Sequence, residues 1–259
     1  MTTSHRRGRE RLRAPELRVA HYARLDRHRG RRIGVPEVIL AEGKAVPHLI
    51  GIVRALHADG HGALISRPSA RQRTALAAER RRGLPLRLVA DGRLAILDGP
   101  LGVEYEPGTV AVVTAGTSDV ALAEESRALL EALGLRVVHA YDVGVAGVHR
   151  LIRALRELER SRPGIYLVFA GREGALPTVL AGLVRAPVVG VPTSSGYGRG
   201  GRGEAALGAM LQSCAPIAVV NIDAAVPAAL FAAQGFARSP RSAGPVRRSG
   251  GRAWTRRTG

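Results

Sequence analysis

The sequence has a single cysteine, Cys214, among its 259 residues, so no disulfide can form within the chain. Lys44 is the only lysine among 39 basic residues, and aromatic residues make up only 3% of the chain. No apolar run approaches the roughly 18 to 20 residues that span a bilayer, and the arginine-rich N-terminus lacks the apolar segment of a secretory signal. These absences exclude a disulfide scaffold, argue against a membrane partner and predict a cytoplasmic location.

Acidic residues are scarce relative to arginine, and the excess positive charge is unevenly distributed. The formal net charge is +18, but residues 1–32 hold eleven arginines against three acids, and residues 236–259 hold seven arginines and no acid. The segment 33–235 therefore carries only +3 of the total. Basic tails can hold polyanions without specificity, but the few aromatic residues offer no stacking platform for bases. We predict disordered basic tails at 1–14 and 238–259 and do not expect nucleic acid to be a partner.

Residues 15–107 are expected to form a small α/β unit. Apolar periodicity and turn signals predict helices at 15–26, 47–58 and 70–82, and short apolar runs predict strands at 36–40, 62–66, 86–89 and 94–97. Glycine and proline residues between positions 101 and 108 interrupt the periodicity. We place the boundary with a second unit there.

From residue 108 to residue 237 the pattern is regular. Nearly continuous apolar runs predict strands at 109–114, 135–140, 165–170, 187–191 and 217–222, and they alternate with helices predicted at 118–133, 148–160, 174–184, 204–214 and 227–234. Strands that are apolar throughout are typical of a sheet covered on both faces. The alternation predicts a doubly wound, mostly parallel α/β sheet, in which ligands bind beyond the carboxyl ends of the strands.

The stretch from 109 to 142 is one βαβ unit with a small-residue turn between its first strand and its helix. The first turn of a helix presents unpaired N–H groups and the positive end of the helix dipole, so this turn is a candidate phosphate site. Its residues are Gly116, Thr117, Ser118 and Asp119. From the turn alone, the alternative that Thr117, Ser118 and Asp119 only cap the helix stays open.

The loops that follow the predicted strands carry a series of ungapped motifs. They read AGTSDVALAEE, YDVGVAGVHRL, FAGREGALPTVLAGLV, PVVGVPTSSGYG, MLQSCA and AVVNID in chain order, and ARLDRHRGRRIGVPEVILAEGK stands upstream at 23–44. In these motifs the chain resembles the LarB family of nickel-pincer cofactor biosynthesis enzymes, from about residue 23 to residue 235. The second unit is also similar to the aminoimidazole ribonucleotide carboxylase and mutase family, which implies that fold for it.

Two features depart from the related patterns. The purine-pathway enzymes carry Ala-His-Arg after the second strand of this unit, with a histidine that handles the carboxylate, whereas this chain has HAYD with Tyr141 near that place. This difference weakens the purine-pathway interpretation. The loop 198–204, GRGGRGE, is richer in arginine than LarB-like sequences.

The resemblance to the LarB family implies carboxylation of the pyridinium ring of nicotinic acid adenine dinucleotide at carbon 5, with hydrolysis of its phosphoanhydride. An electron-poor pyridinium does not attack carbon dioxide, but addition of a thiolate at carbon 4 makes carbon 5 a nucleophilic enamine carbon. After carboxylation, a base removes the carbon 5 proton and the thiolate leaves. Cys214 is the only thiol, Glu173 is the only carboxylate of the AGREGALP loop, and Asp119 is a third catalytic candidate at a strand end.

Further residues of the strand-end loops are expected to bind the substrate: Gly116, Thr117, Ser118, Tyr141, Asp142, Gly171, Gly174, Thr193, Tyr197, Arg199 and Arg202. We expect the two arginines to close over the anhydride phosphates, because they lie on a glycine-rich loop.

Plainer interpretations of the candidate residues stay open. Cys214, expected at the C-terminal end of the helix that begins at Glu204, also fits a small buried hydrophobe. Glu173 fits a helix first-turn charge favoured by the dipole. Tyr141 and Tyr197 fit either ring-stacking contacts or loop packing.

The resemblance implies no tightly bound cofactor. Carbon dioxide or bicarbonate is a substrate, and whether Mg²⁺ assists the hydrolysis stays open. Small, apolar helical segments at 205–211 and 227–234, together with the similarity to the carboxylase fold, predict a symmetric homo-oligomer, an octamer, with sites near subunit interfaces. Two other functions stay open, a purine-pathway carboxylase or mutase and a non-catalytic nucleotide-binding module.

Overall fold

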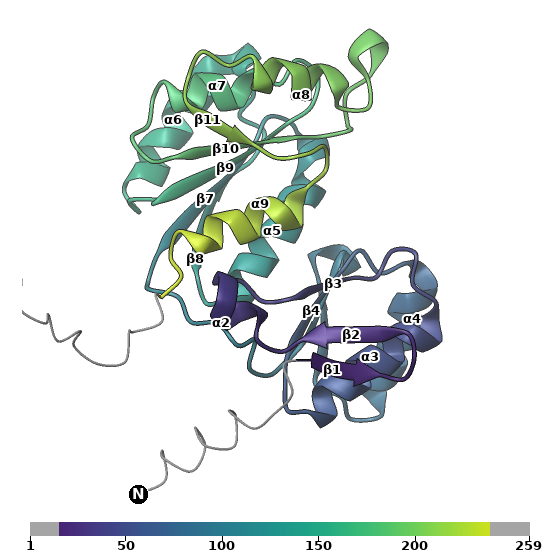
Figure 1. Cartoon of the computed structure of the whole chain (residues 1–259). Coiled ribbons are helices and arrows are strands. Elements are labelled where there is room, and N and C mark those ends of the chain that lie inside the picture. Colours follow the sequence, from purple (N-terminus) through teal and green to yellow (C-terminus); the bar gives the residue numbers. More distant parts are fainter. Residues whose placement is uncertain (1–15, 239–259) are drawn as a thin grey trace, which may run out of the picture.

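A mixed sheet and a parallel sheet form the scaffold of the protein (Figure 1). The structure, a computed structural model, describes residues 16–238. The basic tails predicted at 1–14 and 238–259 lie outside these residues except for Arg238, whose Nε is 2.9 Å from Oε1 of Glu106. No helix in the described range is long and apolar enough to cross a membrane.

The smaller, N-terminal unit contains the mixed sheet, with the strand order β3-β4-β6-β5. Strands β3 and β4 are parallel, whereas β6 is antiparallel to both β4 and β5. Most of the elements predicted for this unit are confirmed, and its bounds are β1 Glu16–Val19, β2 Ala23–Asp26, α2 Arg29–Ile33, β3 Val38–Leu40, α3 Val46–Ala58, β4 Ala63–Ser66, α4 Ala70–Arg81, β5 Leu86–Val89 and β6 Leu94–Leu97.

The helix predicted at 15–26 is wrong, because residues 16–26 form a β-hairpin. Glu16 pairs with Asp26 and Val19 pairs with Ala23 in an antiparallel register. Val19 and Leu25 are buried in the same cluster as the apolar face of α3. Alternate residues of the hairpin pack against α3, and this tertiary packing overrides the helical periodicity of residues 16–26, as it often does for short segments.

The larger unit contains five parallel strands in the order β11-β10-β9-β7-β8. The predicted alternation is confirmed, with bounds β7 Thr109–Thr114, α5 Val120–Ala132, β8 Arg136–Ala140, α6 Val148–Glu159, β9 Ile165–Ala170, α7 Ala175–Ala181, β10 Val188–Pro192, α8 Glu204–Leu211, β11 Ile217–Val219 and α9 Ala225–Gln234. Strands β9 and β10 are buried at every position.

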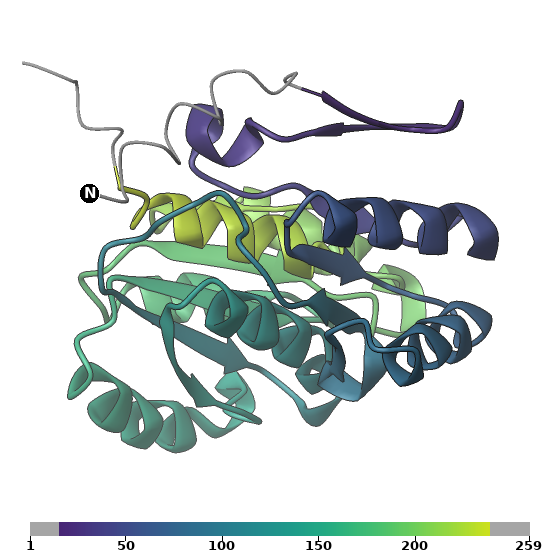
Figure 2. The ribbon, with the colours of Figure 1, turned by 90° about the horizontal axis from the view of Figure 1, so that it is seen from below.

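Helices cover both faces of the parallel sheet (Figure 2). Side chains of α5 and α9 share one apolar cluster with Val112, Leu167 and Val191. Side chains of α6, α7 and α8 share a second cluster with Val113 and Val168. The fold class predicted from the sequence, a doubly wound sheet preceded by a small α/β unit, is thus confirmed.

Helix α5 also belongs to the core of the N-terminal unit. Leu64, Leu94 and Ile96 of the mixed sheet lie in the same cluster as Leu122 and Leu129 of α5. The opposite face of the mixed sheet packs on α3 and α4. Since each fully buried leucine contributes about 1.5 to 3 kcal/mol of apolar burial, this shared core joins the two units firmly.

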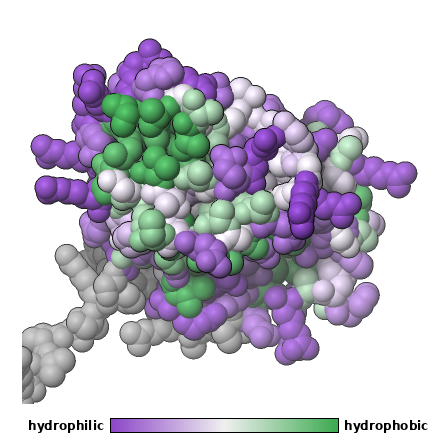
Figure 3. Space-filling view, turned by 90° about the horizontal axis from the view of Figure 1, so that it is seen from above, coloured by the Kyte–Doolittle hydropathy of each residue, from purple (hydrophilic) through white to green (hydrophobic). Residues whose placement is uncertain are grey.

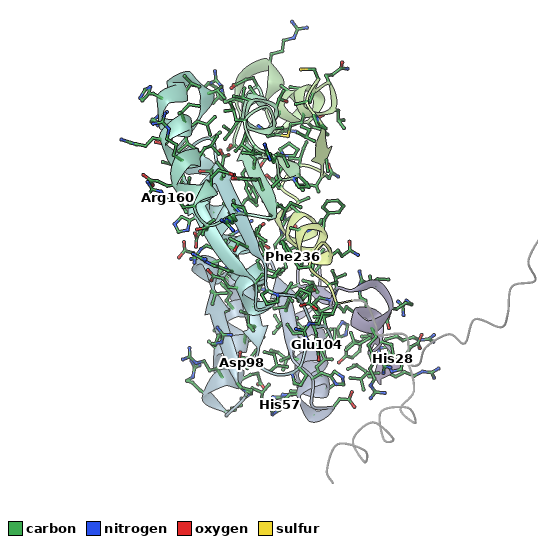
Figure 4. All side chains as sticks on the ribbon, turned by 90° about the vertical axis from the view of Figure 1, so that its left-hand side faces the viewer. His28, His57, Asp98, Glu104, Arg160 and Phe236 are labelled. Carbon is green, nitrogen blue, oxygen red and sulfur yellow. The ribbon has the colours of Figure 1, made fainter. Side chains whose placement is uncertain are left out.

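The linker between the units is held by hydrogen bonds to the segment after α9 and to the N-terminal unit. The amide of Glu106 donates to the carbonyl oxygen of Phe236 at 2.7 Å, and the hydroxyl of Tyr105 donates to the carbonyl oxygen of Gly34 at 3.0 Å. Burial raises the pKa of Tyr105 to about 12, so this hydroxyl stays a donor. Figure 4 shows Phe236 and Glu104 near the junction of the two units.

Candidate substrate site

Three loops meet at the carboxyl edge of the parallel sheet. The turn 116–119 follows β7, residues 171–174 follow β9, and residues 193–195 follow β10. Because β7, β9 and β10 are neighbours and run in one direction, their carboxyl ends form one continuous edge. This edge is where the sequence places the phosphate turn.

Asp119 is the centre of a hydrogen-bonded cluster at this edge. Its side chain is only 3% exposed. One carboxylate oxygen accepts hydrogen bonds from the hydroxyls of Thr193 at 2.6 Å and Ser195 at 2.8 Å, and the other accepts from the amide of Gly116 at 2.9 Å. A buried carboxylate with three donors is bound and oriented on all sides, which suits an organising group.

Gly171 allows the loops after β9 and β10 to approach each other closely. A Cβ atom at this position would lie 2.5 Å from the hydroxyl oxygen of Ser195 and 2.9 Å from that of Thr193. Both distances are shorter than real Cβ contacts allow. The absence of a side chain at Gly171 is therefore a condition for the Asp119 cluster to form.

The hydroxyls of Thr117 and Ser118 face solvent. Both residues are exposed, and neither side chain forms a hydrogen bond with another residue between 16 and 238. Asp119 is the N-cap residue of α5 but does not cap the helix with its side chain. Its carboxylate does cap the short turn 117–119 by accepting the amide of Gly116. The capping alternative therefore stays open for Asp119, whereas the hydroxyls of Thr117 and Ser118 make no capping hydrogen bond in the described residues and are available to an anion.

The loop after β9 holds Glu173 at the surface. Arg172 and Glu173 are both exposed, and the guanidinium carbon of Arg172 lies 4.3 Å from the ring centroid of Tyr197. Gly174 has a φ of +64° and packs against Ala206 of α8, so the loop is held in place behind Glu173. A cation over an aromatic ring is a favourable contact, and here it joins the loops after β9 and β10.

Tyr141 and Asp142 lie at the end of the edge strand β8. The ring of Tyr141 stacks on His139 with centroids 4.6 Å apart, and its hydroxyl donates to Glu124 of α5. Burial and this carboxylate raise the pKa of Tyr141, while the hydrogen bond from Arg127 holds the pKa of Glu124 below its usual range. Asp142 pairs with Arg150 at 3.0 Å. The side chain of Tyr141 is therefore held by α5, and that of Asp142 by α6.

Arg199 and Arg202 lie on the loop between β10 and α8, which projects from the body of the larger unit (Figure 1). Both arginines are exposed. The loop leaves the sheet after Thr193 and returns at Gly203, where a Cβ would lie 3.1 Å from the carbonyl oxygen of Thr193. The two ends of this loop therefore lie next to the Asp119 cluster, and the arginine side chains form no hydrogen bond with it.

Cys214 lies elsewhere in the fold. Helix α8 ends at Leu211, so the expectation that Cys214 ends this helix is wrong. Ser213 redirects the chain by binding the hydroxyl of Thr178 at 2.9 Å and the amide of Ala215 at 3.2 Å. The thiol is exposed, which contradicts the alternative of a buried hydrophobe.

The position of Cys214 separates it from the other candidates within one chain. It precedes β11, whose first residue, Ile217, pairs with Val188 at the amino end of β10. The Asp119 cluster lies at the carboxyl end of β10. A five-residue strand at about 3.3 Å per residue is roughly 16 Å long, so one chain does not bring Cys214 to Asp119 or Glu173.

Two residues of the site, Ser195 and Asp223, are not among the residues predicted from the sequence. Ser195 completes the Asp119 cluster, and Asp223 accepts a hydrogen bond from the amide of Ser194 at 2.8 Å. Both stand in strand-end loops that the sequence identifies, TSSG and NID. Serine and aspartate are so common in loops that composition alone did not distinguish them from ordinary turn residues.

The arrangement is suited to binding an anionic ligand beside a general base. Hydroxyls, a helix N-terminus and three nearby arginines favour phosphate groups, and Glu173 offers an exposed carboxylate. Within residues 16–238, no group of three or more histidine, cysteine, aspartate or glutamate side chains is placed to hold a metal ion.

The larger unit is a doubly wound parallel sheet whose loops gather polar side chains at its carboxyl edge, and comparison with known proteins places it in the carboxylase class. The sequence model of AIR carboxylase matches residues 109–243, and that of the LarB/PurE-like N-terminal domain matches residues 17–94. The chain belongs to the AIR carboxylase family and carries the LarB/PurE-like N-terminal domain.

Individual relatives cover different parts of the chain. An uncharacterized protein of Methanocaldococcus jannaschii is 38% identical over 214 residues, which are 81% of this chain and 82% of that protein. The N5-carboxyaminoimidazole ribonucleotide mutase of Pyrococcus horikoshii is 30% identical over 138 residues, 51% of this chain and 74% of that protein. The crystal structure of PurE from Treponema denticola covers 49% of this chain and 78% of its own, with a TM-score of 0.40 and 23% identity.

Proposed function

We propose that this protein carboxylates the pyridinium ring of nicotinic acid adenine dinucleotide at carbon 5 and hydrolyses the phosphoanhydride, giving pyridinium-3,5-biscarboxylic acid mononucleotide and AMP. The observation that carries the proposal is the exposed thiol of Cys214 in a chain with no other cysteine. A pyridinium ring does not attack carbon dioxide until a nucleophile has added to it, and an accessible thiol can supply that nucleophile. The matching LarB/PurE-like N-terminal domain supports the same assignment.

The atoms and electrons of each step balance. In the hydrolysis, water bonds to one phosphorus of the anhydride and the bridging oxygen leaves on the other phosphate, which gives the mononucleotide and AMP. The carboxylation uses Cys214 and Glu173. The Cys214 thiolate adds to carbon 4 and its electron pair moves into the ring, which cancels the pyridinium charge. Carbon 5 then bonds to carbon dioxide, Glu173 takes the proton from carbon 5, and the thiolate leaves with the electron pair that it brought. The exposed position of Glu173 allows it to exchange this proton with solvent.

The Asp119 cluster serves the phosphates in this proposal. Thr117 and Ser118 present free hydroxyls at the N-terminus of α5, and Arg172, Arg199 and Arg202 stand on adjacent loops. Asp119 itself is bound by three donors, so we assign it to orienting Thr193, Ser195 and the turn. A catalytic role for Asp119 stays a prediction beside this organising role.

Because Cys214 and Glu173 lie at opposite edges of the sheet, we propose that a second copy of the chain supplies the thiol. Cys214 follows α8, whose last residue, Leu211, is 67% exposed, and Val179 and Leu183 at α7 are also exposed. The view from above shows a hydrophobic patch at this end of the molecule (Figure 3). Contiguous exposed apolar surface marks interaction sites, which fits a homo-oligomer, and an octamer stays our prediction.

The reaction is tested by incubating the protein with nicotinic acid adenine dinucleotide and bicarbonate and analysing the products by mass spectrometry. We expect a carboxylated mononucleotide and AMP. Turnover of aminoimidazole ribonucleotide instead would identify a purine-pathway enzyme. Binding of the dinucleotide without consumption would identify a nucleotide-binding module.

The second-copy arrangement is tested by complementation. Cys214→Ser and Glu173→Gln change exposed side chains and should fold normally, yet each alone should be inactive. Co-expressed chains with different tags, purified through both tags, should recover a fraction of wild-type turnover if the two residues come from different copies. No recovery in isolated mixed oligomers would place both residues in one chain.

A further inference from the structure

The N-terminal unit reaches the substrate site through Arg67. This residue follows β4, and its guanidinium Nη2 donates to the carbonyl oxygen of Asp223 in the loop between β11 and α9. The carboxylate of Asp223 in turn accepts the amide of Ser194 at 2.8 Å, while its own amide donates to the carbonyl oxygen of Pro192 at 2.9 Å. Asp223 therefore binds the site loop at both ends of Thr193.

Arg67 and Asp223 are both held in an uncommon backbone conformation. Their φ angles are +54° and +56°, in the left-handed region that costs a non-glycine residue about 1 kcal/mol or more. The amide of Arg67 is fixed by the carbonyl oxygen of Arg93 at 2.7 Å. The contact between Arg67 and Asp223 is therefore made between two backbone segments whose positions are set by their surroundings.

A second attachment holds the other side of the site. Glu125 of α5 is completely buried, and the hydroxyl of Ser66 donates to it at 2.6 Å. Arg93 pairs with the same carboxylate at 3.1 Å. Ser66 and Arg93 belong to the N-terminal unit, whereas α5, Val120–Ala132, belongs to the larger unit. A buried charge satisfied only across the junction requires both units to be in place.

We propose that Arg67 is a positioning residue of the substrate site, which acts through Asp223 on the loop 193–195 and makes the N-terminal unit part of the binding machinery. The role in turnover rests on the proposed function. The structural part stands without it. Hydrogen bonds join Arg67 to the carbonyl oxygen of Asp223 and the carboxylate of Asp223 to the amide of Ser194, whose chain neighbours on both sides bind Asp119.

The test compares Arg67→Ala and Arg67→Lys with the matched control Arg87→Ala, which removes an exposed arginine of the same unit that pairs with Asp98 at 2.8 Å. Hydrogen–deuterium exchange of the peptide that contains Ser194 is measured on the free protein. We expect faster exchange in Arg67→Ala, a smaller change in Arg67→Lys and none in the control, because Arg67 contacts Asp223, which binds the amide of Ser194, whereas Arg87 pairs with Asp98 instead.

Steady-state kinetics with the dinucleotide give the second readout. Arg67→Ala should raise KM about tenfold with kcat within twofold, whereas a general loss of folded enzyme would lower kcat alone. Asp223→Ala should have the same effect, Asp223→Asn should retain much of the wild-type value, and Arg67→Ala with Asp223→Ala should not exceed the larger single effect.

Each outcome decides one of the two proposals. Unchanged exchange at Ser194 in Arg67→Ala overturns the positioning role, as does a KM equal to that of the control. If the wild type does not turn over the dinucleotide, the proposed function fails, while the exchange measurement still decides whether Arg67 holds the loop. If Arg67→Ala does not fold, Arg67→Lys and Asp223→Ala carry the same comparison.

Discussion

The two sheets of this protein are both built from alternating strands and helices, but they differ in strand direction. In the larger unit all five strands run in one direction, so every strand delivers its following loop to a single edge. In the N-terminal unit β6 runs against β4 and β5, so strand ends are divided between two edges. Direction therefore decides which unit can concentrate hydroxyls and charges into a site, and which one supports it.

The distribution of charge differs in the same sense. Several acids of the N-terminal unit are paired with arginines. The buried carboxylate of Glu79 pairs with the exposed Arg54 and Arg82, and the exposed Asp98 pairs with Arg87. The central strands of the larger unit bury mostly apolar side chains, and Asp119, Thr193 and Ser195 lie just beyond the carboxyl ends of these strands.

The largest effect is expected for the thiol of the larger unit. Cys214→Ser should lower carboxylation by several orders of magnitude, because a hydroxyl does not form the carbon 4 adduct at neutral pH. Dinucleotide binding and thermal unfolding should be unchanged, since the side chain is exposed. Product formation by mass spectrometry and a thermal melt measure the two properties, and a fully active variant would remove Cys214 from the mechanism.

Next in size is the junction between the units. Glu125→Ala leaves Arg93 without the buried carboxylate that it pairs with, so we expect the free energy of unfolding to fall by about 3 kcal/mol. Glu125→Gln, which keeps an acceptor for Ser66, should lose less. Urea denaturation measures both variants, and equal stability of all three proteins would show that the junction does not depend on this charge.

Gly171→Ala should damage the site with little effect on the N-terminal unit. The added methyl group would lie 2.5 Å from the hydroxyl of Ser195 and must displace the loop after β10. We expect kcat/KM to fall about 100-fold, roughly 2.7 kcal/mol of transition-state stabilisation. Gly235→Ala, where the nearest atom is the carbonyl oxygen of Ala232 at 3.3 Å, is the control and should stay within twofold.

A smaller, pH-dependent effect is expected for Glu79 of α4. Its hydrogen bond from Arg54 holds its pKa below the ordinary 4.5, so its contribution to stability is present above that pH and is lost as the pH falls through the pKa of the folded state. Glu79→Gln should lower the melting temperature by about 3 °C at pH 7. The gap from the wild type should narrow as the pH falls below 4.5, and a gap that widens on acidification would contradict this sign.

The smallest effect is expected for the exposed pair of Arg87 and Asp98. Both side chains are about half exposed, and surface ion pairs contribute little because solvent and salt screen them. Arg87→Ala should change the free energy of unfolding by no more than about 0.5 kcal/mol and leave turnover unaltered. A loss larger than that of Glu125→Gln would show that surface pairs, and not the shared core, stabilise the N-terminal unit.

Local sequence pattern predicts most elements, and its clearest failure is the segment 16–26. Apolar runs and helical periodicity predict the five parallel strands and their helices, because each of these elements buries a continuous face. Residues 16–26 bury only alternate side chains against α3. Their hairpin therefore depends on the apolar face of α3, which lies outside the segment. The end of α8 was misplaced for a similar reason, since Ser213 binds Thr178 of another helix.

By itself, the sequence determined the alternation of strands and helices, the small-residue turn at 116–119 and the absence of any thiol but Cys214. These follow from spacing and composition, which act over a few neighbouring residues. Only the tertiary structure decided that Ser195 and Thr193 bind Asp119, that Cys214 lies at the opposite edge of the sheet, and that Arg67 reaches Asp223 across 156 positions. The physical reason is that strand direction and strand order, which set these distances, are properties of the assembled sheet.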